Sequence, residues 1–192
     1  MKYNDENYVI SEGTGSWKKH SNVQIMESYQ EHITGEVLDV GCNTGGVTYW
    51  LSRNDNVKSI TGVDINPQVE EIFNKNMDGV EIEVNFIACN YLQRRAINKE
   101  FDTVISFHTL EHIYPEDAIK FATNIAFNLK KGGKAVISLP YEKAYADDHH
   151  KAFYNEKKLV LLFESAGMKC IECFKDDRWH ENNLLTGLFT KE

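Results

Sequence analysis

Histidine and glutamate side chains gather in two short stretches of the sequence. His108, Glu111 and His112 stand together in FHTLEHI, and His149 and His150 follow further along the chain. A histidine exchanges protons near neutral pH, and histidine with glutamate also supplies ligands for divalent cations. The set therefore permits general base catalysis by His112 or His150, or cation binding by Glu111, His112 and one of the later histidines. A third interpretation gives Glu111 and His112 only a role in orienting their loop.

A second candidate site is the glycine-containing turn in LDVGCNTGG. Gly41 and Gly45 allow the backbone to turn tightly and to approach a ligand closely. Asp64 comes about 20 residues later, where a carboxylate can accept hydrogen bonds from ribose hydroxyls. Asp39 precedes the turn, where a carboxylate suits loop anchoring or a cationic ligand better than a diphosphate. The turn reads G-x-N-x-x-G, so the pattern favours a positively charged nucleoside over a dinucleotide such as NAD.

Apolar runs alternate with helical patterns in the sequence around these residues. We expect strands at residues 36–41, 59–65, 82–89, 101–107 and 134–140, and helices at 21–33, 46–54, 67–76, 115–129 and 155–166. The lysines and glycines at 130–133 are expected to close the helix at 115–129. Strands joined by helices run parallel, and ligands bind beyond the carboxyl ends of such strands. Both candidate sites follow predicted strand ends.

The C-terminal part of the sequence has a different pattern. KCIECFK and LLTGLFT are both typical of strands, and no helix is predicted between them. Two strands connected in this way pair antiparallel. The sequence therefore predicts an α/β fold with a mostly parallel, doubly wound sheet and an antiparallel C-terminal hairpin.

Length and charge limit the classes of function. The chain has 192 residues and a net charge of −8, from 21 Lys+Arg and 29 Asp+Glu. We expect a single domain over residues 1–192, with an N-terminal lid and helix at 1–34 and a core at 35–192. The acidic balance disfavours nonspecific binding to nucleic acids and anionic membranes. No segment has the pattern of a signal peptide or a spanning helix, so we expect a cytoplasmic protein without membrane association.

The cysteines do not suggest a metal or disulfide framework. Cys42, Cys89, Cys170 and Cys173 are too few for a disulfide scaffold at this length. The C-x-x-C pair lacks the second pair that would complete a zinc site, and it lies in a predicted strand. We therefore expect free thiols.

Four motifs in order give the sequence a family resemblance: VLDVGCNTGG, GVDIN, FDTVISFHTLEHI and LKKGGKAVISLP. Together they resemble the class I S-adenosylmethionine-dependent methyltransferases, over residues 36–167 and into the C-terminal hairpin. The resemblance implies a Rossmann-like, doubly wound seven-stranded sheet, mostly parallel with an antiparallel C-terminal hairpin. It also implies an enzyme that uses S-adenosyl-L-methionine, releases S-adenosyl-L-homocysteine and methylates an oxygen or nitrogen atom.

The same resemblance implies which residues surround the cofactor. The methionine part would be surrounded by Asp39, Gly41, Cys42 and Gly45. The ribose would be held by Asp64, with Ile65 against adenine and Asn90 and Tyr91 at the adenine edge. The sulfonium would lie beside the backbone of Phe107 and His108.

Two residues depart from the family pattern. Asn43 stands where the middle glycine is usual, and asparagine tolerates positive φ better than most residues. Asn90 stands where aspartate is common, and its amide keeps an oxygen acceptor for the adenine amino group. These departures leave open the alternative of a catalytically silent, cofactor-binding partner subunit.

The acceptor site is expected after the fourth and fifth strands. His108, Glu111, His112 and His150 are the catalytic candidates, and a small-molecule acceptor is the first expectation, with no resident metal assigned. The turn is also similar to that of methyltransferases that modify the 3′-terminal 2′-hydroxyl of small RNAs with a divalent cation. In this chain His108 replaces their first glutamate, and the acidic charge disfavours RNA. We further expect the N-terminal segment Trp17–His20 to form a lid over the cofactor. The rim of the acceptor pocket is expected to include Tyr141, Tyr145, Trp179 and His180.

Overall fold

The computed structural model describes residues 21–142, 148–176 and 183–192. The expected lid at Trp17–His20 lies outside the described residues, as do Tyr145, Trp179 and His180. Within the described ranges, no helix is long and apolar enough to cross a membrane.

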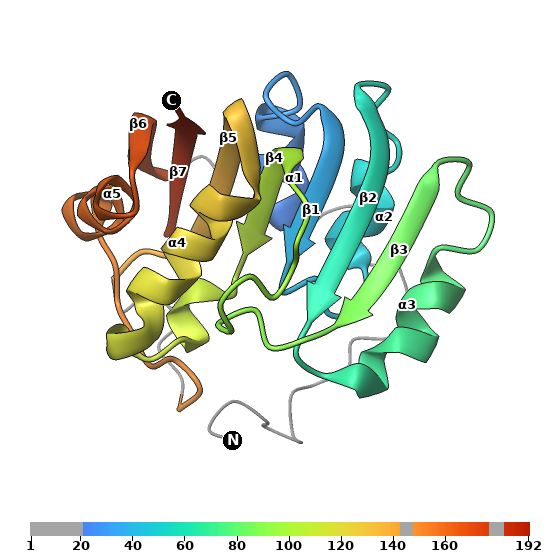
Figure 1. The fold of residues 1–192 in the computed structure, drawn as a ribbon, viewed down its shortest axis with the longest axis horizontal. Coiled ribbons are helices and arrows are strands. Elements are labelled where there is room, and N and C mark those ends of the chain that lie inside the picture. The colour runs from blue at the N-terminus through green and yellow to red at the C-terminus, as the bar shows by residue number, and fades with distance from the viewer. Residues whose placement is uncertain (1–20, 143–147, 177–182) are drawn as a thin grey trace.

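A seven-stranded sheet forms the centre of the molecule, with helices on both faces (Figure 1). The strands are β1 (Gly35–Val40), β2 (Val57–Asp64), β3 (Glu83–Ala88), β4 (Phe101–Phe107), β5 (Leu129–Pro140), β6 (Met168–Asp176) and β7 (Leu184–Lys191). The helices are α1 (Ser21–Ser28), α2 (Gly46–Leu51), α3 (Glu70–Asn76), α4 (Ala118–Asn128) and α5 (Glu156–Ser165).

The strand order is β3-β2-β1-β4-β5-β7-β6. Pairing is parallel from β3 to β5, whereas β7 pairs antiparallel with both β5 and β6. The predicted fold class, including the C-terminal hairpin, is confirmed. The chain adds β2 and β3 on one side of β1 and then continues with β4 on the other side. In a doubly wound sheet, this switch point between β1 and β4 opens a crevice for ligands.

Two hydrophobic clusters cover the two faces of the sheet. In Figure 1, α4 lies in front of β4 and β5, while α1 and α2 lie behind β1 and β2. Phe121 of α4 and Phe163 of α5 belong to the front cluster, where the Phe163 and Phe189 rings stack with centroids 4.5 Å apart. Ile25 of α1 and Leu51 of α2 are fully buried in the other cluster. The strands between the clusters are apolar on both sides, as expected for a covered parallel sheet.

Most predicted elements are found, but the helices are shorter than expected. The helix predicted at 21–33 ends at Ser28, and the one predicted at 46–54 ends at Leu51. The helix predicted at 67–76 begins with a 3₁₀ turn, in which the Asn66 side chain accepts a hydrogen bond from the Gln68 amide at 3.0 Å. The helix predicted at 115–129 likewise begins with a 3₁₀ turn (Pro115–Asp117) and ends at Asn128.

The expectation that residues 130–133 close that helix is wrong. β5 begins at Leu129, immediately after α4, and pairs Leu129 with Phe101 and then Lys134 with Thr103. Residues 130–133 form a bulge in the strand between these two pairs. Lys130 there makes ion pairs of 3.0 Å with both Glu36 and Asp102, so its charge is used at the sheet end and not at a helix terminus.

Two asparagines of α4 hold the segment that connects β3 to β4. Asn124 donates hydrogen bonds to the carbonyls of Tyr91 and Gln93, at 2.6 and 2.9 Å. Asn128 donates to the carbonyls of Ile97 and Lys99, at 2.8 and 2.7 Å, and accepts a bond from the Tyr91 hydroxyl at 2.9 Å. Because this connection contains no regular helix, side-chain amides satisfy backbone carbonyls that would otherwise be buried without partners.

Replacing Asn128 by alanine is expected to lower the free energy of unfolding by about 2–4 kcal/mol. The change removes three hydrogen bonds and leaves the buried Tyr91 hydroxyl and Ile97 carbonyl unsatisfied. Urea denaturation measures the effect. Asn74→Ala, at an exposed position of α3, is the matched control, and we expect it to change stability by less than about 0.7 kcal/mol. Equal losses in the two variants would contradict this account of the connection.

Candidate functional site

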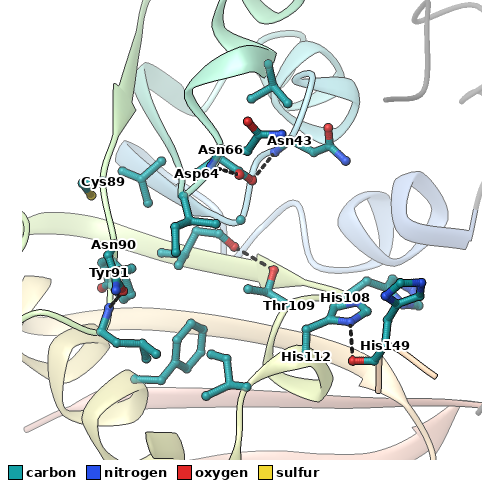
Figure 2. A pocket seen from close by; sticks show the side chains of 18 of the residues that line it. Asn43, Asp64, Asn66, Cys89, Asn90, Tyr91, His108, Thr109, His112 and His149 are labelled. Carbon is teal, nitrogen blue, oxygen red and sulfur yellow. Dashed lines mark hydrogen bonds between the residues drawn. The ribbon is translucent and has the colours of Figure 1, made fainter. Parts of the chain in front are cut away.

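One cavity opens at the carboxyl ends of β1, β2, β3 and β4 (Figure 2). It is lined by Val40, Gly41, Asn43, Val63, Asp64, Ile65, Asn66, Val69, Cys89, Asn90, Tyr91, Leu92, His108, Thr109, His112, Ile113, Phe121, His149 and Lys151. Figure 2 shows Asn90 and Tyr91 on one side, Asp64 and Asn43 above, and the histidines on the opposite side. The cavity therefore joins the glycine turn to the histidine cluster.

The glycine turn wraps the end of β1 around the end of β2. Gly41, Asn43 and Gly45 have φ values of 81°, 47° and 84°, all in the left-handed region. The Gly41 amide donates to the Val63 carbonyl at 2.8 Å, and a side chain on Gly41 would collide with Thr109. Asn43 therefore adopts the conformation that a glycine would have here. Its Oδ1 is buried and, among the described residues, has no hydrogen-bond partner.

Asp64 is fixed in position by backbone amides. Its Oδ2 accepts from the Asn43 amide at 3.0 Å, and its Oδ1 accepts from the Asn66 amide at 2.9 Å. Burial raises the pKa of this carboxyl group, and these backbone hydrogen bonds lower it in part. Each carboxylate oxygen has a second lone pair, so both can also accept from hydroxyl groups of a ligand in the cavity.

Asp39 lies beneath the turn and does not line the cavity. Only 3% of this residue is exposed, and its Oδ2 accepts a hydrogen bond of 2.6 Å from the Thr48 hydroxyl of α2. Burial, with a smaller contribution from the negative charge of Asp64, raises the pKa of Asp39 to about 7. The carboxylate thus ties the first turn of α2 to β1.

This raised pKa predicts a pH dependence of stability. Because the pKa is about 7 in the folded chain and 3.8 ordinarily, the folded state holds the proton more tightly between these values. The group therefore lowers the free energy of unfolding as pH rises through that window, by up to about 1.4 kcal/mol per pH unit. We expect Asp39→Asn to be more stable relative to wild type at pH 8 than at pH 5. Urea denaturation of both proteins tests this, and parallel pH profiles would refute it.

Three other expected cofactor residues also lie outside the cavity lining. The Cys42 sulfur lies against Gly62 of β2, Gly45 lies against Phe73 of α3, and Phe107 belongs to a core cluster. The expected residues that do line it are Gly41, Asp64, Ile65, Asn90, Tyr91 and His108. Tyr141, expected at the acceptor rim, is not among the lining residues and has the Lys175 ammonium 5.4 Å from its ring centroid.

The adenine-side residues are held by local contacts. The Asn90 Oδ1 accepts a hydrogen bond from the Leu92 amide at 3.0 Å, so part of its acceptor capacity stabilises the turn after β3. The Tyr91 ring packs edge-on against Phe121, with centroids 5.7 Å apart. Cys89 and Thr109 also line the cavity, although sequence reasoning did not select them. Their positions just after the ends of β3 and β4 are the feature of the sequence that could have identified them.

The histidine cluster forms where the ends of β4 and β5 meet. His108 has a φ of 54°, and its Nδ1 lies 3.2 Å from Oε1 of Glu111. Glu111 is 2% exposed, and its Oε2 is buried with no hydrogen-bond partner among the described residues. The His112 and His150 rings meet edge to face at 5.1 Å. All four catalytic candidates therefore lie together.

Residues 149–152 are fastened to this cluster through the backbone. The Lys151 and Ala152 amides donate to the Glu111 carbonyl at 2.7 and 3.1 Å. The His112 Nδ1 lies 3.3 Å from the His149 carbonyl oxygen. Of the two later histidines, His150 brings its imidazole to Glu111 and His112, whereas His149 contributes its carbonyl.

A family model described as "Methyltransferase domain" matches residues 37–133, half of the chain. This stretch contains the glycine turn, Asp64 and the first part of the histidine cluster. The chain belongs to the S-adenosylmethionine-dependent methyltransferase family. The predicted resemblance is thereby confirmed, and the cofactor of this family is S-adenosyl-L-methionine.

Curated relatives match the methyltransferase over part of their length. Cyclopropane-fatty-acyl-phospholipid synthase of Escherichia coli K12 is 26% identical over 61% of this chain and 31% of its own. Phosphoethanolamine N-methyltransferase 3 of Arabidopsis thaliana is 28% identical over 69% of this chain and 26% of its own. The chain thus matches about a third or less of the length of these relatives.

Solved structures share the fold over nearly the whole chain. An S-adenosylmethionine-dependent methyltransferase from Clostridium acetobutylicum has a TM-score of 0.73 at 15% identity, covering 91% of this chain and 92% of its own. The N-methyltransferase NodS from Bradyrhizobium japonicum has a TM-score of 0.73 at 16% identity, covering 93% and 98%.

Proposed function

We propose that the methyltransferase binds S-adenosyl-L-methionine in the described cavity and methylates a nitrogen or oxygen atom of a small-molecule acceptor. The observation that carries the proposal is the extent of the cavity, which runs from Asp64 to His108 and His112. One end offers acceptors for ribose hydroxyls, and the other offers side chains that can bind an acceptor or receive its proton.

The lining fits the separate parts of this cofactor. Ile65 and Val69 supply apolar surface beside Asp64, which suits an adenine ring next to its ribose. The unpartnered Oδ1 of Asn43 offers an acceptor to the amino or hydroxyl groups of the ligand. When bound, S-adenosyl-L-methionine supplies a methyl group on a sulfonium and leaves as S-adenosyl-L-homocysteine.

The residues after β4 and β5 are proposed to hold the acceptor. Methyl transfer is an in-line displacement, so alignment of the two reactants and exclusion of water supply most of the catalysis. His108 and His112, which line the cavity, are proposed to bind the acceptor and take up its proton, and Glu111 and His150 are proposed to orient them. The Arabidopsis relative is named a phosphoethanolamine N-methyltransferase, which supports nitrogen among the acceptor atoms.

Isothermal titration with S-adenosyl-L-methionine and S-adenosyl-L-homocysteine tests the first half of this proposal. We expect one site per chain with micromolar affinity, and no heat with NAD as the control dinucleotide. Single-turnover assays with a labelled methyl donor and separate amine and hydroxyl acceptors test the second half. Absence of binding to either adenosyl ligand would overturn the proposed function, and the silent partner subunit would become the better account.

A further inference from the structure

We propose that Glu111, His112 and His150 bind a divalent transition-metal cation, with zinc the best match. One nitrogen from each imidazole and one carboxylate oxygen lie within 4.8 Å of one another. The proposed binding does not depend on the proposed function, although the role given to the cation below does.

The distances allow closure around an ion. The His112 Nε2 lies 4.0 Å from Oε1 of Glu111. Ligands that each lie about 2.0–2.2 Å from a tetrahedral zinc are about 3.3–3.5 Å apart, so the cluster must contract by about an ångström. We expect rotations of the Glu111 carboxylate and the two rings to bring the ligand atoms to this distance.

The protonation of His112 is suited to metal binding. Its Nδ1 faces the His149 carbonyl oxygen at 3.3 Å, and a carbonyl can only accept, so Nδ1 carries the hydrogen in this contact. In the neutral ring the lone pair then lies on Nε2, the atom on the Glu111 side. A ring N–H that donates to a backbone carbonyl while the other nitrogen binds the metal is the common arrangement of metal-binding histidines.

The environment of Glu111 also calls for a positive charge. This carboxylate is 2% exposed, and a buried carboxylate is costly unless a cation or donors neutralise it. His108 reaches only Oε1, while Oε2 has no hydrogen-bond partner among the described residues. The Lys151 ammonium donates to the Asp148 carbonyl at an exposed position and does not serve here. A metal ion bound between Glu111 and the two imidazoles would supply this charge.

The ligand types select the metal. Two imidazoles and one carboxylate suit zinc, cobalt and related ions, whereas magnesium and calcium prefer oxygen ligands throughout. Three protein ligands leave a tetrahedral zinc one open position. Because His112 lines the cavity, we infer that this position faces the acceptor.

Under the proposed function, the cation would bind an acceptor hydroxyl and lower its pKa. With His112 and His150 bound to the cation, the hydroxyl proton passes to water in place of these histidines, and the oxygen forms a bond to the methyl carbon. The bond between that carbon and sulfur breaks, and its electron pair stays on sulfur as the neutral thioether. The inference thus narrows the acceptor to a compound with a hydroxyl group that can reach the metal.

Cobalt titration of the metal-free protein, followed by visible absorption, tests the site without any adenosyl ligand. We expect one equivalent of cobalt to give d–d bands, and one equivalent of zinc to abolish them. Glu111→Gln and His150→Ala should each weaken cobalt binding at least about 100-fold, since even outer partners of metal ligands are worth 10–100-fold. His150 is partly exposed, so its variant should fold even if the Glu111 variant does not.

His149→Ala is the matched control, because it removes a neighbouring imidazole that is not in the cluster. We expect it to keep wild-type cobalt affinity. No d–d bands with wild type, or bands unchanged by His150→Ala, would overturn the metal site. Cobalt binding without binding of S-adenosyl-L-homocysteine would instead uphold the metal site and overturn the proposed function.

Discussion

Replacing Asp64 by alanine is expected to weaken binding of S-adenosyl-L-methionine by at least about 100-fold. The proposed complex has both carboxylate oxygens accepting from ribose hydroxyls, and each hydrogen bond to a charged group contributes about 1.5–3 kcal/mol. The same oxygens accept from the Asn43 and Asn66 amides, so the variant also loosens the turn that shapes the cavity. Isothermal titration of both proteins measures the loss.

A ribose analogue separates contact with the ligand from damage to the turn. We expect wild type to bind 2′,3′-dideoxy S-adenosyl-L-homocysteine much more weakly than the natural compound. Asp64→Ala should bind both with nearly equal, weak affinity, because the partner of the hydroxyls has gone. The difference between the effect of removing the hydroxyls in wild type and in Asp64→Ala then measures the interaction between Asp64 and the ribose. If the variant discriminates between the two compounds as strongly as wild type, Asp64 does not bind the ribose.

Replacing Gly41 by alanine is expected to lower the free energy of unfolding by about 2–5 kcal/mol. Its φ of 81° costs a residue with a side chain about 1–2 kcal/mol. The new Cβ would also collide with the Thr109 hydroxyl, and such overpacking adds about 1–3 kcal/mol. Because Gly41 and Thr109 both line the cavity, the readjustment should weaken binding of S-adenosyl-L-homocysteine as well.

Gly79→Ala provides the matched control for this prediction. Gly79 has a φ of 76°, and a Cβ there would meet nothing within 4 Å. It should therefore show the conformational cost alone, about 1–2 kcal/mol, with unchanged ligand affinity. Urea denaturation of both variants gives the comparison. Similar losses at the two glycines would mean that Thr109 moves aside and that the close approach of β1 and β4 is not constrained.

Local patterns predicted the sheet and the position of the site well. Strand β4 is found at the predicted residues, and Asp64 lies at the end of β2 beside the glycine turn, because short apolar runs and positive-φ turns are encoded locally. The position of Lys130 could not be predicted from its neighbours. A lysine after a helix is typical of a C-terminus, but Glu36 and Asp102, distant in sequence, attract it to the sheet end.

The finer structure of the site depends on contacts between distant segments. The sequence does not predict that Asn124 and Asn128 of α4 hold the segment between β3 and β4. These asparagines find their carbonyl partners only after the sheet has formed. The choice between His149 and His150 also remained open in the sequence. It depends on a backbone carbonyl lying against His112, a contact that residue types alone do not encode.

The place of β7 between β5 and β6 has a consequence for synthesis on the ribosome. β6 is made before β7, yet in the finished sheet it pairs only with β7. Until β7 emerges, β5 therefore presents an open edge that includes Val136 and Ile137, and an apolar edge of this kind readily pairs with other chains. We expect nascent chains that stop before Leu184 to aggregate or to recruit chaperones, because β5 and β6 are joined into one sheet only when β7 is inserted between them.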